Sequence, residues 1–297
     1  MRTTLALIVS AALLVAACVD EGNDEAVRLS VAYLVAQQNT DGGFSGAPES
    51  PSDFSTSAWV ALAFAAGGAP PASTQKLRGY LASQADAVAQ DATGAFSAVG
   101  AVCMFVLAAE ALGDPSSVYG TTDPRARLLA ESENESLALN EKIFILGTIG
   151  KETTSASVIA IMDELKTGLD DPGHELLAKD AWFRSNALLA LLRAGEDDDS
   201  TRMRQWAQSL LPFQVKDAGF AASPEYPPDA STTANVVAVF ADVPFVYSHE
   251  RAAGAEFIQG LQQPDGSVKF SHDGDFARTK TTAEAVLGWT GKGPFQR

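Results

Sequence analysis

Cysteine and histidine are scarce in this chain, and their scarcity removes several kinds of chemistry. Its 297 residues include two cysteines, Cys18 and Cys103, and three histidines. The histidines, His174, His249 and His272, have no metal-ligand spacing, and two cysteines cannot build a disulfide framework or a cysteine-rich zinc site. Cys103 lies in an apolar run and is expected to be a small buried side chain. The sequence therefore predicts no metal site and no cofactor.

Basic charge and the common nucleotide and hydrolase motifs are also lacking. The chain has 21 Lys and Arg against 37 Asp and Glu, a net charge of −16 at pH 7. Such a field disfavours nucleic acid and anionic lipid surfaces, which excludes nucleic-acid binding. We find no Gly-rich loop that precedes a helix and no Gly-x-Ser-x-Gly nucleophile elbow.

The N-terminus is predicted to be a targeting segment. The apolar run Leu5–Val15 is too short to span a bilayer permanently. It ends in Leu14-Val15-Ala16-Ala17-Cys18, which resembles the bacterial lipobox, where cleavage precedes a cysteine that is then lipidated. We expect residues 1–17 to be a lipoprotein signal peptide, Cys18 to carry the lipid and residues 18–26 to form an acidic tether. The protein would then be anchored to a membrane of the bacterial cell envelope, facing the periplasm or the exterior. An ordinary secretory signal with a chance cysteine is the alternative.

The sequence does contain an internal repeat. Its clearest copy, Gln37-Gln38-Asn39-Thr40-Asp41-Gly42-Gly43-Phe44, returns as Phe213–Phe220 and Gln262–Ser267, with a weaker echo at Asp91–Phe96. Asn and Asp hydrogen-bond their own backbone and Gly supplies positive φ, so this segment ends one helix and reverses the chain. The phenylalanine is expected to pack between the two helices. Each copy therefore joins a helix pair.

From residue 27 onward the apolar spacing predicts only helices, in six pairs. An apolar helix must be buried, whereas an amphipathic helix faces water on one side. An open solenoid needs polar capping units, and here the first and last pairs resemble the middle ones. We therefore predict an all-α fold, a single α6/α6 toroid over residues 27–297. The expected inner helices are Ser55–Ala66, Ala98–Leu112, Ala138–Ile149, Ala181–Ala194, Ser231–Ala241 and Thr282–Thr290; the expected outer helices are Val27–Gln38, Thr74–Ala87, Pro124–Glu131, Ser155–Leu165, Arg202–Phe213 and Arg251–Gln262.

This repeat resembles that of the prenyltransferase/squalene-cyclase toroid family. The family pattern is Gln-Gln-x-x-Asp-Gly-Gly-Phe, followed by Asp-x-Ser-Thr and an apolar helix. Here the second part reads Asp53-Phe54-Ser55-Thr56 and Asp229-Ala230-Ser231-Thr232, with a third copy at Arg278–Thr282. The resemblance is strong in pairs one, five and six and faint in pairs three and four. It implies a closed ring of helices, and a fold does not by itself carry a function.

The catalytic motifs of that family are mostly absent. Class II terpene cyclases protonate their substrate from Asp-x-Asp-Asp, whereas Asp53 and Asp229 each stand alone and are expected to be helix N-caps. Protein prenyltransferases place an Asp, a Cys and a His on zinc, whereas Cys103 is expected in mid-helix. The acidic run Glu196–Asp199 follows an inner helix and is expected in a solvated loop. The Gly-Cys-Gly-Glu-Gln thioester motif of some extracellular relatives is missing.

The N-termini of the inner helices are the expected site. They carry free N–H groups and partial positive charge, and they meet at one mouth. Charge on an apolar helix is costly unless it is paired or wet, and charges, amides and tryptophans would suit a small polar ligand, such as a sugar or a small acid. Alternatively, Lys142 pairs with Glu141, Arg184 pairs with Asp180, and the tryptophans only fill the core. The candidate ligand-binding residues are Trp59, Lys142, Arg184, Asn186, Asn235 and Glu284, with Trp182, Phe183 and Trp289 as further aromatics.

Three functions follow, in this order. The first is a non-catalytic binding or scaffold module anchored at the cell surface, supported by the missing acid and zinc motifs. The second is a divergent terpene-cyclase or prenyltransferase-like enzyme. The third is a carbohydrate-active enzyme, because other α/α toroids are polysaccharide lyases and glycosidases. A glycosidase needs two carboxylates ~5–10 Å apart, and the weak catalytic candidates are Asp53, Asp229 and Glu284.

Overall fold

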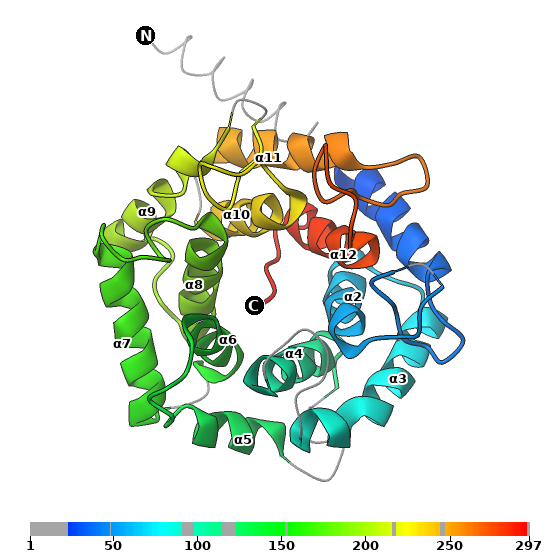
Figure 1. Ribbon diagram of the computed structural model, residues 1–297, viewed down its shortest axis with the longest axis horizontal. Coiled ribbons are helices and arrows are strands. Elements are labelled where there is room, and N and C mark those ends of the chain that lie inside the picture. The colour runs from blue at the N-terminus through cyan, green and yellow to red at the C-terminus, as the bar shows by residue number, and fades with distance from the viewer. Residues whose placement is uncertain are drawn as a thin grey trace, which may run out of the picture.

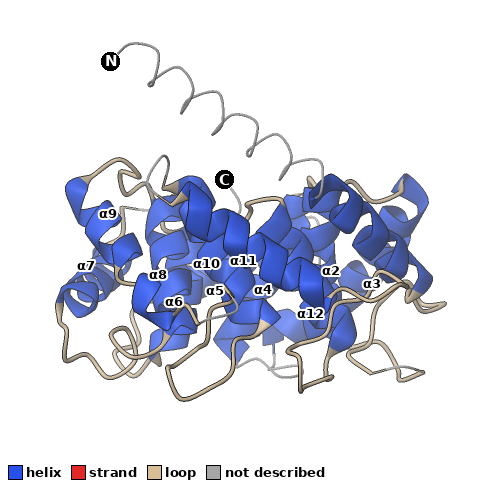
Figure 2. Ribbon diagram, turned by 90° about the horizontal axis from the view of Figure 1, so that it is seen from above, coloured by secondary structure: helices blue, strands red, loops and turns tan. Residues whose placement is uncertain are grey.

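A computed structural model describes residues 23–47, 49–90, 98–114, 123–151, 154–215, 218–243 and 247–295. Across these ranges the regular structure is helical, and extended backbone occurs only as isolated bridges such as Phe44 to Asp53. The helices form two concentric rings around a central axis (Figure 1). Seen from the side, the rings form a disc whose loops gather at one end (Figure 2). The predicted all-α toroid is confirmed.

The inner ring is closed. Each of its helices packs against the next, and the last, α12, packs against the first, α2, so the circle has no free end. The predicted second members of the pairs form this ring, with boundaries shifted by up to four residues. Its members are α2 (Phe54–Gly67), α4 (Ala98–Ala111), α6 (Leu139–Ile149), α8 (Ala181–Ala194), α10 (Ala230–Asp242) and α12 (Arg278–Trp289).

The outer ring consists of the amphipathic members. Its first helix covers residues 23–36, so it begins four residues earlier than expected and residues 23–26 are helical rather than part of a tether. Ala26 explains this start, because only 1% of its surface is exposed and it belongs to the core. The other outer helices are α3 (Pro71–Gln90), α5 (Pro124–Glu131), α7 (Ala156–Asp170), α9 (Thr201–Gln208) and α11 (Ser248–Leu261), and a short 3-10 helix, η2 (Leu211–Phe213), follows α9.

Three inner helices begin at an aspartate that caps the helix. The carboxylates of Asp53, Asp180 and Asp229 accept hydrogen bonds from the backbone N–H three residues on, at 2.7, 3.1 and 2.8 Å. Such caps satisfy N–H groups that the helix itself leaves without partners. At the other end, Gly68 and Gly195 adopt the left-handed conformation that ends α2 and α8.

The repeated turn has the same geometry in all three strong copies. In the first, the Asn39 N–H donates to the Gly43 carbonyl and the Gly42 N–H donates to the Asn39 carbonyl, both at 3.0 Å. The Phe44 N–H then donates to Ser57 Oγ on α2 at 2.8 Å. The matching bonds join Phe220 to Thr233 and Val268 to Thr282, and the side chains of Phe44, Phe220 and Val268 are fully buried.

These turns also fix the outer helix of the next pair. Gln38 Nε2 donates to the Ser73 carbonyl in α3, and the matching Gln262 Nε2 donates to the Ala26 carbonyl in the first outer helix, at 2.9 and 2.8 Å. Residues 23–36 therefore hold the position after the sixth pair that α3 holds after the first. The ring closes with the contacts that join its neighbouring repeats.

The C-terminal segment turns into the ring after α12 (Figure 1). Phe295 is 4% exposed, and its ring meets that of Phe144 edge-on at a centroid distance of 5.3 Å. Gly147 on α6 leaves the room for this ring, because a Cβ there would lie 2.4 Å from it. Phe295 thus fills part of the ring's interior. In the described ranges no helix is long and apolar enough to cross a membrane.

Candidate functional site

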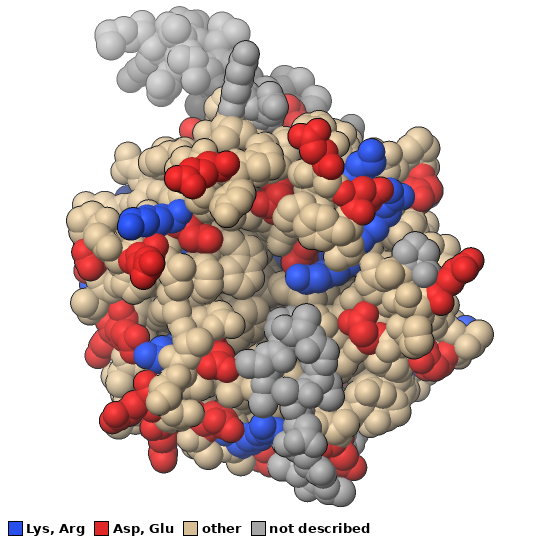
Figure 3. Space-filling model, in the orientation of Figure 1, with Lys and Arg blue, Asp and Glu red and all other residues tan. Residues whose placement is uncertain are grey.

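The mouth of the toroid lies at the N-terminal ends of the inner helices. On this face the molecule is hollowed near its centre, and basic and acidic side chains stand together at the edge of the hollow (Figure 3). The loops of the repeat surround it, because each loop leads into the start of an inner helix.

One position of the repeat supplies the interior of this mouth. Ser57, Thr233 and Thr282 point outward, since each binds the backbone of a repeat loop. Two residues further along, a helix has turned by about 200°, so the side chains there point toward the ring's axis. These residues are Trp59, Asn235 and Glu284; in α8, the residue equally far from its capping Asp180 is Asn186.

Phe144 marks the same level on α6. It lies six residues after the N-cap, as Trp59, Asn186 and Asn235 do, and it meets Phe295 inside the ring. We call Trp59, Phe144, Asn186, Asn235 and Glu284 the lumen layer. Their side chains come from α2, α6, α8, α10 and α12 and are 0–6% exposed.

The lumen layer contains polar atoms without partners. Trp59 Nε1 and Asn186 Oδ1 are buried and have no hydrogen-bond partner among the described residues, although Asn186 Nδ2 donates to the Trp182 carbonyl at 2.8 Å. Leaving such a group unsatisfied costs ~1–3 kcal/mol. Native proteins keep few such groups, so these atoms indicate a place where a polar molecule binds.

Lys280 links Glu284 to Trp59. Its ammonium lies 3.5 Å from Glu284 Oε1 and 5.5 Å from the centre of the Trp59 ring. Glu284 is 5% exposed, so this contact offsets part of the cost of burying its carboxylate. The Trp59 ring and the lysine attract each other because the face of an aromatic ring is electron-rich. The three side chains close the side of the mouth between α2 and α12.

Asp229 is the most perturbed carboxyl group at the mouth. Burial raises its pKa to about 6, hydrogen bonds from Thr232 act in the opposite direction, and the nearby charge of Glu284 raises it further. Asp229 is 6% exposed and Thr232 Oγ1 donates to its second oxygen at 2.8 Å. Asp53, by contrast, uses both oxygens on backbone N–H groups, those of Thr56 and Gly46.

Lys142 does not line the mouth, contrary to our expectation. Its ammonium bonds both carboxylate oxygens of Glu164 on the outer helix α7, at 2.8 Å. The expected pair with Glu141 is also wrong, because Glu141 accepts the Ala138 N–H at the start of α6. Lys142 lies two residues before the lumen position, so the helix turns it toward the outer ring.

Arg184 and Trp289 are also misplaced by the sequence argument. Arg184 Nη2 donates to the Leu169 carbonyl near the end of α7 at 2.9 Å, so it faces outward and does not pair with Asp180. Burial lowers the pKa of Arg184. Trp289 lies at the C-terminal end of α12, where Nε1 donates to the Ala255 carbonyl, far from the mouth.

Two features of the site were missed. Lys280 was absent from the predicted residues although it lies one turn before Glu284, and that spacing was a readable signal for an ion pair. Phe295 gave no sequence signal because it lies after the last repeat. Cys18 lies outside the described residues. Cys103 is buried, and burial raises the pKa of its thiol to about 12.

Metal binding finds no support in the described ranges. They contain no group of three or more His, Cys, Asp or Glu side chains arranged to hold an ion. The chemistry at the mouth therefore rests on an indole, amides, two buried carboxyl groups and one ammonium.

Comparison with known proteins places this ring. The sequence model of the prenyltransferase alpha-alpha toroid domain matches residues 1–99 and 178–287, more than half of the chain. The chain belongs to the prenyltransferase α/α-toroid family. The resemblance of its repeat is thereby confirmed, and the two matched ranges contain the three strong copies of the turn. No curated protein matches it in sequence.

Solved structures agree on the fold. A protein from Actinoplanes is 15% identical with a TM-score of 0.63, covering 91% of this chain and 99% of its own. A type II terpene cyclase from Scytonema is 13% identical with a TM-score of 0.62, covering 91% and 98%. A polysaccharide lyase is 12% identical with a TM-score of 0.59, covering 91% and 97%. At these identities the likeness concerns the fold alone.

Proposed function

We propose that the protein is a lipid-anchored protein of the bacterial cell envelope whose toroid mouth binds a small polar ligand, a carbohydrate by our first choice, without catalysing a reaction. The observation that carries this proposal is the pair of buried, unpartnered atoms Trp59 Nε1 and Asn186 Oδ1 in one layer of the mouth. One is a donor and the other an acceptor. A sugar hydroxyl both donates and accepts, so a single sugar ring can satisfy both.

The rest of the lumen layer suits the same ligand. Asn235 adds an amide that has no printed partner and is 6% exposed, and Glu284 adds a carboxylate that accepts from hydroxyl groups. The indole of Trp59 offers an apolar face on which the C–H side of a sugar can pack. A few convergent polar groups beside aromatic surface are typical of small-molecule sites.

The address rests on the N-terminus. The lipobox-like Leu14-Val15-Ala16-Ala17-Cys18 supports lipidation of Cys18, and the acidic chain would need such an anchor because its net charge of −16 disfavours anionic membrane surfaces. The partners we propose are thus the membrane, through the lipid, and a small ligand in the mouth.

Calorimetric titration with neutral mono- and oligosaccharides tests the binding role. Trp59→Phe keeps an aromatic ring but removes the N–H donor, so we expect it to weaken binding by about tenfold, or 1.4 kcal/mol. The control is Trp206→Phe on α9, whose indole bonds Asp170 on the outer ring; it should leave the affinity within about twofold. Absence of sugar binding, or equal losses in both variants, would refute the carbohydrate proposal.

One observation favours a second candidate, a carbohydrate-active enzyme. Asp229 has a pKa raised to about 6 and lies near the buried Glu284, and carboxyl pairs whose environments differ are used as acid and base. Polysaccharide cleavage that follows an acidic group near pH 6 and is lost in Asp229→Asn would establish it. Terpene-type chemistry has no comparable support, because Asp53 and Asp229 each cap a helix as single carboxylates.

A further inference from the structure

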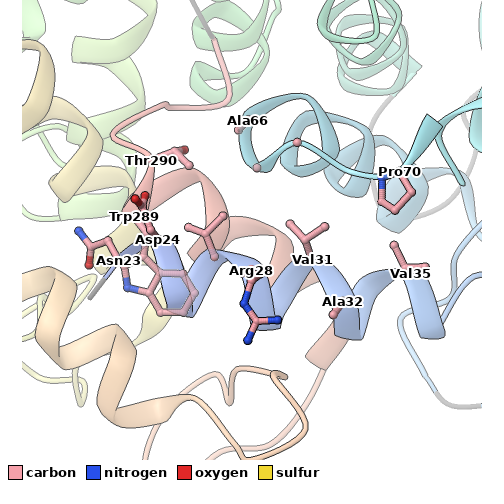
Figure 4. A pocket seen from close by; sticks show the side chains of 13 residues that line it. Asn23, Asp24, Arg28, Val31, Ala32, Val35, Ala66, Pro70, Trp289 and Thr290 are labelled. Carbon is pink, nitrogen blue, oxygen red and sulfur yellow. The ribbon is translucent and has the colours of Figure 1, made fainter. Parts of the chain in front are cut away.

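A second recess lies at the opposite end of the toroid from the mouth. It is a groove of about 620 Å³ between the first outer helix and the C-terminal ends of α2 and α12. In Figure 4, Val31 and Val35 project from this helix toward α2, and Trp289 lies at one end of the groove. Ala66 and Pro70 form the facing wall. Its volume is in the range of ligand pockets.

The sequence explains why this groove is apolar. Val27, Val31 and Val35 are spaced four residues apart, so they form one stripe along the helix of residues 23–36. The end of α2 opposes them with small residues: a Cβ on Gly67 would lie 2.7 Å from Val31 Cγ2, whereas around Gly68 nothing lies within 4 Å. The stripe is therefore covered at its middle and left open beside it.

The polar side chains of the groove gather toward the start of the helix. Asn23 and Asp24 line this end, and Arg28 is held by Glu25 through bonds of 2.7 and 2.6 Å. The groove thus has a polar end at residue 23 and an apolar body toward Val35. Such polarity matches a ligand with one polar attachment point and a hydrocarbon chain.

We propose that this groove holds one acyl chain of the lipid attached to Cys18, an inference that rests on the proposed lipidation. Five residue steps separate Cys18 from Asn23, and extended chain covers at most ~17 Å over that length. From residue 23 to residue 35 the helix rises ~18 Å, so the groove offers an elongated apolar bed that starts within reach of the lipid. Burial of the chain against valines and the indole is favourable because it removes methylene groups from water.

This arrangement would orient the protein. Because the groove lies at the C-terminal ends of the inner helices, a chain held there places that end of the toroid against the membrane. The mouth then faces away from the bilayer and stays open to ligands.

The test uses the full chain in a bacterial host fed with a fatty acid that carries a photoreactive diazirine. After irradiation of intact membranes, mass spectrometry identifies both the modification of Cys18 and the peptides cross-linked to the acyl chain. We expect cross-links to peptides that contain residues 23–36 or 61–70. Ala32→Phe should reduce them about tenfold by filling the groove, whereas Ala36→Phe should not. Ala32 and Ala36 are both exposed and lie one turn apart; Ala32 lines the groove and Ala36 does not.

The outcomes separate the two proposals. A lipidated Cys18 whose chain cross-links only to bilayer lipids, or to another protein, overturns the groove inference and leaves the anchor intact. An unmodified Cys18 overturns both. The cross-link map of the natural protein decides between these outcomes even where a variant fails to fold.

Discussion

Ser30 Oγ donates a hydrogen bond to the carbonyl oxygen of Gly266 at 2.7 Å, although 236 positions separate the two residues in the sequence. Gln262 binds the same serine, through Nε2 to Ser30 Oγ at 2.9 Å. These bonds join the first outer helix to the turn of the last repeat. The stability of the whole toroid therefore depends on a contact between its two ends.

Gly266→Ala should open this contact. Gly266 has φ +88°, and a Cβ there would lie 2.2 Å from the Leu29 carbonyl oxygen, so both the backbone and the helix have to shift. We expect a loss of about 2–4 kcal/mol in the free energy of unfolding. The control is Gly260→Ala, a helical position with nothing within 4 Å, where the change should be neutral or stabilising by up to ~1 kcal/mol. Equal denaturation midpoints for the two variants would contradict this role of the closure.

Phe295 should contribute to stability although it lies near the C-terminus. It is 4% exposed inside the ring, so Phe295→Ala should lose about 3–5 kcal/mol through lost burial and a new cavity. Phe276 is 59% exposed, and Phe276→Ala should cost less than about 1 kcal/mol. Urea denaturation compares the two. A Phe295 variant as stable as the natural chain would show that the segment does not pack inside the ring.

Asp229 should make stability fall as pH rises from about 4 to about 6. In this window the unfolded chain, with a pKa near 3.9, has lost the proton that the folded protein with its pKa of about 6 still holds. The sign follows because the state that binds more protons is favoured at lower pH, and the loss amounts to about 2–3 kcal/mol.

The variant Asp229→Asn isolates this effect, because asparagine caps a helix nearly as well and does not titrate. Its stability relative to the natural protein should increase between pH 4 and pH 6 and stay level outside that window. Asp53→Asn, at the matching cap of α2, should leave the dependence due to Asp229 in place. A difference between Asp229→Asn and the natural protein that is the same at every pH would argue against the buried carboxyl group.

Thiol titration distinguishes the two cysteines. Cys103 is fully buried with a pKa raised to about 12, so the folded protein should not react there. With Cys18 lipidated, the native protein should show no reactive thiol and the denatured protein one. A native protein with one reactive thiol, and two after denaturation, would contradict the lipid anchor.

The architecture was predictable because the repeat carries it. Each copy of the turn fixes where one helix ends and the next begins, and the apolar helices could only be the buried ring. The third copy departs from the expected pattern in one detail, since Val268 rather than Phe270 takes the position of Phe44.

The site was predictable only in part, because position along a helix does not give direction around it. Trp59, Asn186, Asn235 and Glu284 were singled out correctly as inner-helix residues and fall on one level. Lys142 and Arg184 were grouped with them because they are charged, yet each lies two residues before that level and so faces the outer ring. Counting from the capping residue would have separated the two sets, whereas their partners Glu164 and Leu169 depend on how α7 packs.

The most direct test of the account is an experimental structure of the mature toroid grown without added ligand, inspected at Trp59 Nε1 and Asn186 Oδ1. The account predicts ordered polar density, from a co-purified ligand or water, within hydrogen-bond distance of both atoms. Apolar side chains packed against both atoms, with no density between them, would contradict a binding site in the mouth.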